Sequence, residues 1–110
     1  MNPQHKDLAA GRWNELPFLE QMANIGSEVE RALNWRVKQN ADYSRKAFER
    51  ALELVDLTLE CVTGMARFKE LTRMREAIVD FFVGPNQFKS TEASWKKYFL
   101  SFTYAARRNH

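Results

Sequence analysis

The sequence has few of the residues that most catalytic and metal-binding sites require. Its 110 residues include one cysteine, Cys61, and two histidines, His5 and His110. A single cysteine excludes an internal disulfide framework and a zinc site built from several cysteines, and the two histidines lie near opposite ends of the chain. The sequence contains no glycine-rich phosphate-binding loop. We therefore expect a protein that is not an enzyme and that uses no metal or cofactor.

Glycine and proline are also scarce, with 4 and 3 residues, whereas 45% of the residues are hydrophobic. Folds built from short strands need frequent turn residues, so this composition favours an all-α domain with a sizeable core. No apolar run approaches the length of about 18 residues that a membrane span requires, and the first residues lack the apolar core of a signal peptide. These absences predict a cytoplasmic protein that does not enter a membrane.

Apolar residues recur at helical spacing in four segments, separated by short polar or glycine-containing connections. Pro17 suits a first helical turn capped by Asn14, Gly84 and Pro85 end the third segment, and Thr91 suits the N-cap of the fourth. Short connections favour antiparallel neighbours. The sequence thus predicts an antiparallel four-helix bundle with helices at 15–38, 42–61, 66–83 and 92–107.

The bundle is expected to form a single domain over residues 15–110, preceded by a flexible N-terminal arm over residues 1–14 in which Trp13 is the candidate anchor. Gly26 lies inside the first predicted helix, where glycine costs about 1 kcal/mol relative to alanine. This cost indicates either the close approach of another backbone or a small bend.

The fourth predicted helix carries apolar residues on two faces. One face consists of aromatic residues that suit the core, and Leu100 and Tyr104 lie one turn apart on the opposite face. Because a helix with two apolar faces usually packs against two surfaces, we expect a homo-oligomer or another protein contact through this face. Trp35 lies off the apolar stripe of the first helix, so it is either a flank residue that closes the core or an exposed interface anchor.

Nucleic-acid binding is the alternative function. Residues 85–110 carry five basic residues and one acidic residue, a net charge of +4. Aromatic residues beside cations suit phosphate neutralisation combined with base stacking. The candidate contacts are Lys96, Lys97, Arg107 and Arg108.

Two further sets of charged residues have more than one interpretation. Glu49, Glu53, Asp56 and Glu60 form an acidic ridge on one face of the second helix, either as a solvated surface or as a docking strip for a basic partner or a divalent cation. Arg36 and Arg75 fall within apolar stripes. Each arginine must form an ion pair, for which Glu28 and Glu76 are candidates, reach the end of the bundle, or contribute to an interface or an anion-binding pocket.

The sequence Arg-Ala-Leu-Asn-Trp at 31–35 and the sequence Arg-Ala-Leu-Glu-Leu-Val-Asp-Leu-Thr at 50–58 accompany this four-helix pattern. In architecture, residues 15–107 resemble small prokaryotic helical proteins of the HEPN and nucleotidyltransferase-substrate-binding type. The members of the HEPN group that cleave RNA carry an arginine a few residues before a histidine, and neither His5 nor His110 has an arginine at the corresponding distance. The resemblance therefore implies a non-catalytic accessory protein.

Overall fold

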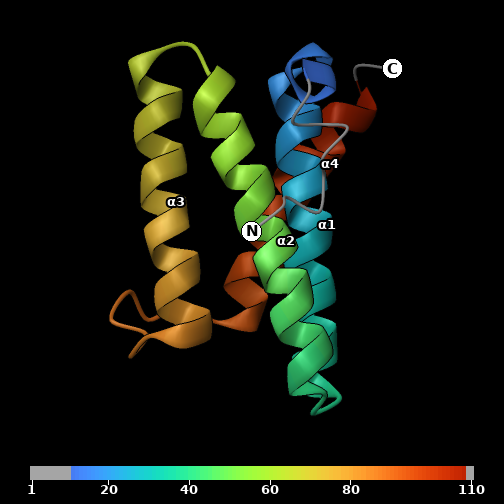
Figure 1. Ribbon diagram of the computed structural model, residues 1–110, viewed down its shortest axis with the longest axis vertical. Helices are drawn as coiled ribbons and strands as arrows, with labels where there is room; N and C mark the ends of the chain where they lie inside the picture. Colours follow the sequence, from blue (N-terminus) through green and yellow to red (C-terminus); the bar gives the residue numbers. More distant parts are fainter. Residues whose placement is uncertain (1–10, 109–110) are drawn as a thin grey trace.

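The computed structural model describes residues 11–108, which form four long helices and a short 3-10 helix and contain no strand. The helices are α1 (Phe18–Val37), α2 (Ala41–Cys61), α3 (Met65–Val83) and α4 (Glu92–Arg108). Successive helices run in opposite directions (Figure 1). This arrangement confirms the predicted all-α four-helix bundle, and the four predicted helix ranges match closely. None of the helices in this part of the chain has an apolar stretch long enough to cross a bilayer.

Helix α1 lies at the centre of the packing. It contacts α2 along one side and α4 along another, whereas α3 lies beside α2 at the edge of the bundle (Figure 1). The apolar stripe predicted for α1 supplies most of its buried residues, because residues three and four positions apart share one helix face. These buried apolar residues are Met22, Ile25, Val29, Ala32 and Leu33.

Gly26 lies where the Phe99 side chain of α4 packs against α1. A Cβ atom built on Gly26 would lie 2.7 Å from the Cβ of Phe99, closer than two carbon atoms can pack. The Phe99 Cβ is fixed to the α4 backbone, so it cannot move aside without moving the helix. The glycine therefore makes room for the Phe99 side chain between two helices, whereas the sequence led us to expect the approach of another backbone or a small bend.

The start of α1 differs from the prediction. Helix α1 begins at Phe18 rather than at residue 15, and the 3-10 helix η2 (Trp13–Glu15) precedes it. Leu16 is extended, with φ −79° and ψ 137°, because the residue before a proline is disfavoured in the helical region. A continuous helix through Leu16 and Pro17 is thereby blocked, and Asn14 does not cap α1.

Trp13 is buried, with 3% of its surface exposed, and it attaches η2 to the bundle. Its Nε1 donates a hydrogen bond of 2.9 Å to Thr58 Oγ1, and Gln21 Nε2 donates one of 2.9 Å to the Trp13 carbonyl. The packed domain thus begins before residue 15. The remainder of the predicted arm, residues 1–10, lies outside the described residues.

The N-terminus of α4 is capped as expected. Ser94 N donates to Thr91 Oγ1 at 3.0 Å, and Thr91 N donates to Ser94 Oγ at 2.9 Å. The hydroxyl oxygen of each of these two residues thus accepts a hydrogen bond from the backbone N–H of the other, across the first turn. The cap fixes where α4 begins and hence the register in which its residues face the core.

The tight contact at Gly26 predicts that adding a methyl group there lowers the stability of the fold. Gly26→Ala should destabilise the fold by about 1–2 kcal/mol, because overpacking costs roughly 1–3 kcal/mol and better helix propensity returns at most about 1 kcal/mol. Urea denaturation measures the difference.

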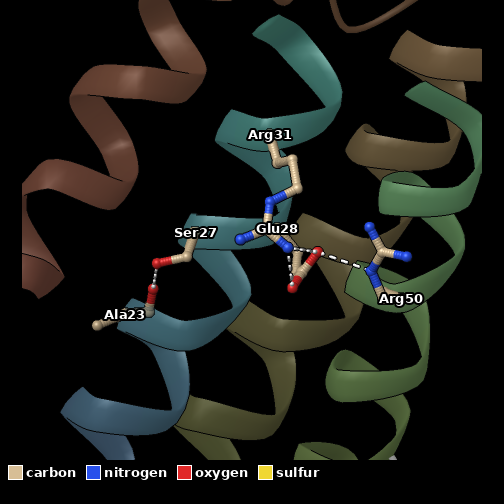
Figure 2. Close-up of polar contacts among 5 residues, drawn as sticks. All are labelled: Ala23, Ser27, Glu28, Arg31 and Arg50. Carbon is tan, nitrogen blue, oxygen red and sulfur yellow. Dashed lines mark hydrogen bonds and ion pairs between the residues drawn. The ribbon is translucent and has the colours of Figure 1, made fainter. Parts of the chain in front are cut away.

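Ser27→Ala is the matched control. Ser27 is exposed on the same helix, and its hydroxyl donates only to the Ala23 carbonyl, at 3.2 Å (Figure 2). We expect it to change stability by less than about 0.5 kcal/mol. Equal stability of Gly26→Ala and the wild type would contradict a tight α1–α4 contact.

Candidate functional site

Helix α4 presents two chemically different faces. Trp95, Phe99 and Ala106 are buried against the bundle. Leu100 and Tyr104 lie on the opposite side, with exposed fractions of 66% and 63%. The structure therefore leaves these two large apolar side chains uncovered by any described residue of the chain.

The rotation of α4 about its axis decides which residues face outward. Phe99 packs against Gly26, and its ring stacks with Trp95 at a centroid distance of 6.1 Å. Tyr98 Oη donates a hydrogen bond of 3.1 Å to Glu70 Oε2 of α3. Burial, together with the charge of Glu70, raises the pKa of Tyr98 far above its usual value, so the hydroxyl keeps its proton and remains a donor.

Four cations surround the exposed apolar residues. Lys96 pairs with Glu92 at 3.1 Å, and the Arg108 guanidinium carbon lies 5.9 Å from the centroid of the Tyr104 ring. Lys97 and Arg107 are exposed. We call this surface the α4 outer face, and it comprises Ala93, Lys96, Lys97, Leu100, Tyr104, Arg107 and Arg108. It is a narrow apolar strip with basic margins.

Trp35 does not belong to the α4 outer face. It lies on α1 nine residues beyond Gly26, which is about 13 Å along the helix axis from the Phe99 contact. The indole is half-buried, its edge packs against the Tyr43 ring at a centroid distance of 4.8 Å, and Lys38 Nζ lies 5.1 Å from its ring. Trp35 thus closes the turn between α1 and α2.

The acidic ridge is partly neutralised by cations of the chain itself. Asp56 accepts a hydrogen bond of 2.8 Å from Arg75 Nε, and Glu49 lies 4.0 Å from Arg45 Nε. Glu60 is exposed at the end of α2. Within residues 11–108 no group of three or more acidic, histidine or cysteine side chains is arranged to hold a metal ion.

The two arginines that the sequence places in apolar stripes do not face inward: Arg36 is exposed and Arg75 is half-buried, and their partners differ from those expected. Arg75 pairs with Asp56, and the hydrogen bond that it donates to that carboxylate raises the pKa of the guanidinium. Glu28 instead accepts bonds from Arg31, at 3.2 Å, and from Arg50 of α2, at 3.1 Å (Figure 2). Neither Glu28 nor Glu76 pairs with Arg36 or Arg75 in the described part of the chain, so the proposed partners were wrong.

Arg36 reaches the end of the bundle. Its guanidinium carbon lies 4.6 Å from the centroid of the Phe81 ring and 5.7 Å from that of Phe82. These distances are typical of cation–π contacts. Arg36, at the last turn of α1, therefore packs against two phenyl rings at the end of α3.

Cys61 has a structural environment. It is half-buried at the end of α2, where its Sγ accepts a hydrogen bond of 3.4 Å from Gln21 Nε2. This bond joins it to the group that holds Trp13. His5 and His110 lie outside the described residues.

Two hollows in the surface were not predicted from the sequence. A groove of about 640 Å³ lies between α3 and α4 with Met74, Trp95 and Tyr98 in its wall, and a pocket of about 380 Å³ lies between the ends of α1, α2 and α3. Each is assembled from segments distant in the chain. The only signal of the second pocket is the cationic residue, Arg36, within an apolar stripe.

Comparison with known proteins adds no relative. No protein-family model, no curated protein and no solved structure matches this chain. The resemblance to the HEPN group stays a prediction.

The ion pair between Arg75 and Asp56 predicts a measurable coupling. A double-mutant cycle with Arg75→Gln and Asp56→Asn should give a coupling of about 0.5 kcal/mol, because partly exposed ion pairs contribute roughly 0.2–1 kcal/mol. Denaturation at two salt concentrations measures it, and the coupling should fall at the higher one.

Glu60→Gln is the control for the general charge of the ridge, since Glu60 forms none of the ion pairs described. Its combination with Arg75→Gln should show a smaller coupling. Zero coupling between Arg75 and Asp56 at low salt would mean that the crossing ion pair does not hold α3 against α2.

Proposed function

We propose that this protein is a non-catalytic interaction or accessory protein that forms a homo-oligomer through the α4 outer face. The observation that supports the proposal is the exposure of Leu100 and Tyr104, one turn apart, on a helix whose opposite side is already buried. Exposed apolar patches rimmed by polar residues are typical of protein interaction sites. A contact with a second copy would remove both side chains from water.

A two-fold axis between Leu100 and Tyr104 gives the simplest such contact. Two α4 helices would then cross antiparallel, and Leu100 of each copy would meet Tyr104 of the other. Lys97 and Arg107 would lie at the margin, where cations of the two copies approach one another. This repulsion makes the association weak at low salt, and added salt should strengthen it by screening the charges.

The test of this proposal is the removal of the apolar strip. Sedimentation equilibrium should show a concentration-dependent oligomer for the wild type, and the double variant Leu100→Ser, Tyr104→Ser should weaken it at least tenfold, since each side chain contributes about 1 kcal/mol or more of burial.

Met65→Ser is the matched control, because Met65 on α3 is equally exposed, at 67%, and lies outside the α4 outer face. It should leave the association unchanged. A wild type that stays monomeric at every concentration tested, or a double variant that associates as the wild type does, would refute the proposal.

Nucleic-acid binding is the second candidate, favoured by Lys97, Arg107 and Arg108 beside the exposed Tyr104 ring. If the four cations of the α4 outer face contact phosphates, the logarithm of the binding constant for duplex DNA should fall with the logarithm of salt at a slope of roughly −3.6. A gel-shift titration at several salt concentrations measures this slope.

Lys97→Gln should reduce that slope by about 0.9, and Lys46→Gln on α2 is the control that should not. Failure to retard DNA or RNA at low salt would eliminate this alternative. Salt also separates the two candidates, because it should strengthen self-association and weaken nucleic-acid binding.

The remaining predictions from the sequence belong to this proposal as well. They are a cytoplasmic location and the accessory role that the HEPN resemblance implies. Fluorescence microscopy of a tagged chain tests the location. An accessory role requires a partner, and we expect this partner to bind the α4 outer face. The double variant Leu100→Ser, Tyr104→Ser should then lose the partner.

A further inference from the structure

The pocket of about 380 Å³ lies at the end of the bundle away from the C-terminus of α4, the lower end in Figure 1. Residues from the end of α1, the first two turns of α2 and the end of α3 line it. Most of its wall is apolar, with Phe48, Phe82 and Val83 as the largest apolar residues. Pockets of roughly 300–1,000 Å³ with apolar walls and a few polar groups are typical of small-molecule sites.

Arg36 supplies the charge of this pocket. Its guanidinium lies over the phenyl rings of Phe81 and Phe82, and within residues 11–108 it forms no ion pair. Stacking occupies the faces of a guanidinium, whereas its N–H donors point outward in the plane. The two cation–π contacts keep the group beside the rings, and within residues 11–108 no hydrogen bond from its N–H donors is present, so these donors are available to a ligand.

Two other polar residues of the pocket wall, Ser44 and Arg45, are already engaged, whereas Gln39 contributes an uncharged amide. Ser44 Oγ donates a hydrogen bond of 2.8 Å to the Ala32 carbonyl. Arg45 lies 3.8 Å from Asp42 and 4.0 Å from Glu49, so two carboxylates offset its charge. Arg36 is thus the lining cation without a carboxylate partner in the described structure. The pocket therefore keeps one positive charge that no carboxylate neutralises.

We propose that this pocket binds a small organic anion, in which a carboxylate or phosphate group is attached to an apolar or aromatic body. The oxyanion would accept paired hydrogen bonds from the edge of the Arg36 guanidinium, as arginine commonly gives to planar oxyanions. The apolar body would lie against Phe48, Phe82 and Val83. The site does not involve the α4 outer face, so the two proposals stand or fall separately.

Titration followed by NMR of the backbone amides tests the proposal with four probes. Phenyl phosphate and benzoate join an oxyanion to a ring, inorganic phosphate has only the charge, and benzyl alcohol has only the ring. At least one of the first two should shift the amides around Arg36, Phe48 and Val83 saturably, with a dissociation constant of about 1 mM or lower. The last two should bind at least tenfold more weakly.

Three variants assign the binding to the pocket. Arg36→Gln should weaken binding at least tenfold, and Val83→Asp, which places a carboxylate at an exposed position of the wall, should do the same by repulsion. Arg31→Gln is the matched control, because Arg31 is an exposed arginine of the same helix and pairs with Glu28. It should bind as the wild type does.

Four results would overturn the proposal. They are no saturable shift with either aromatic anion, shifts that map to another surface, unchanged binding by Arg36→Gln, and inorganic phosphate that binds as tightly as phenyl phosphate. The last result would show a general attraction of anions to a basic protein. A wild-type spectrum for the Arg36→Gln variant outside the pocket verifies that a loss of binding is not a loss of fold.

Discussion

The contact between Gly26 and Phe99 is the constraint on which the exposed surface depends. Since Gly26 has no side chain, the side chain of Phe99 packs directly on the α1 backbone, and α4 lies on α1 with Phe99 inward. Helical geometry then fixes the rest, because Leu100 and Tyr104 follow Phe99 by one and five residues and project from the other side. The α4 outer face is therefore a consequence of core packing on α1.

Three buried apolar residues and two polar contacts hold the outer helix α3, which lies at the edge of the bundle. Its buried residues are Leu71, Met74 and Ile78, and it is joined to α2 by the Arg75–Asp56 ion pair and to α4 by the Tyr98–Glu70 hydrogen bond. Partly exposed ion pairs contribute little each. The apolar stripe thus supplies most of the stabilisation, and the polar contacts tie α3 to both of its neighbours.

Periodicity and capping were sufficient to predict the four helices, because both act over a few neighbouring residues. The same local information placed Leu100 and Tyr104 opposite the core face of the last helix, as the structure has them. It failed at Leu16, where the constraint imposed by Pro17 outweighed the apolar spacing. It also failed for the arginines, since Arg75 and Asp56 are 19 residues apart and meet only when two helices pack in a given register.

The arginines show why the pocket was beyond the reach of the sequence while the α4 outer face was not. A helix face is determined by residues three and four positions apart, whereas the pocket requires Arg36, Phe48 and Phe82 from three helices. An arginine in an apolar stripe indicates that some partner is needed, but only the packed structure distinguishes a carboxylate from a phenyl ring. For Arg75 that partner is a carboxylate, which cancels the charge, and for Arg36 it is a pair of rings, which orient the charge and leave it available.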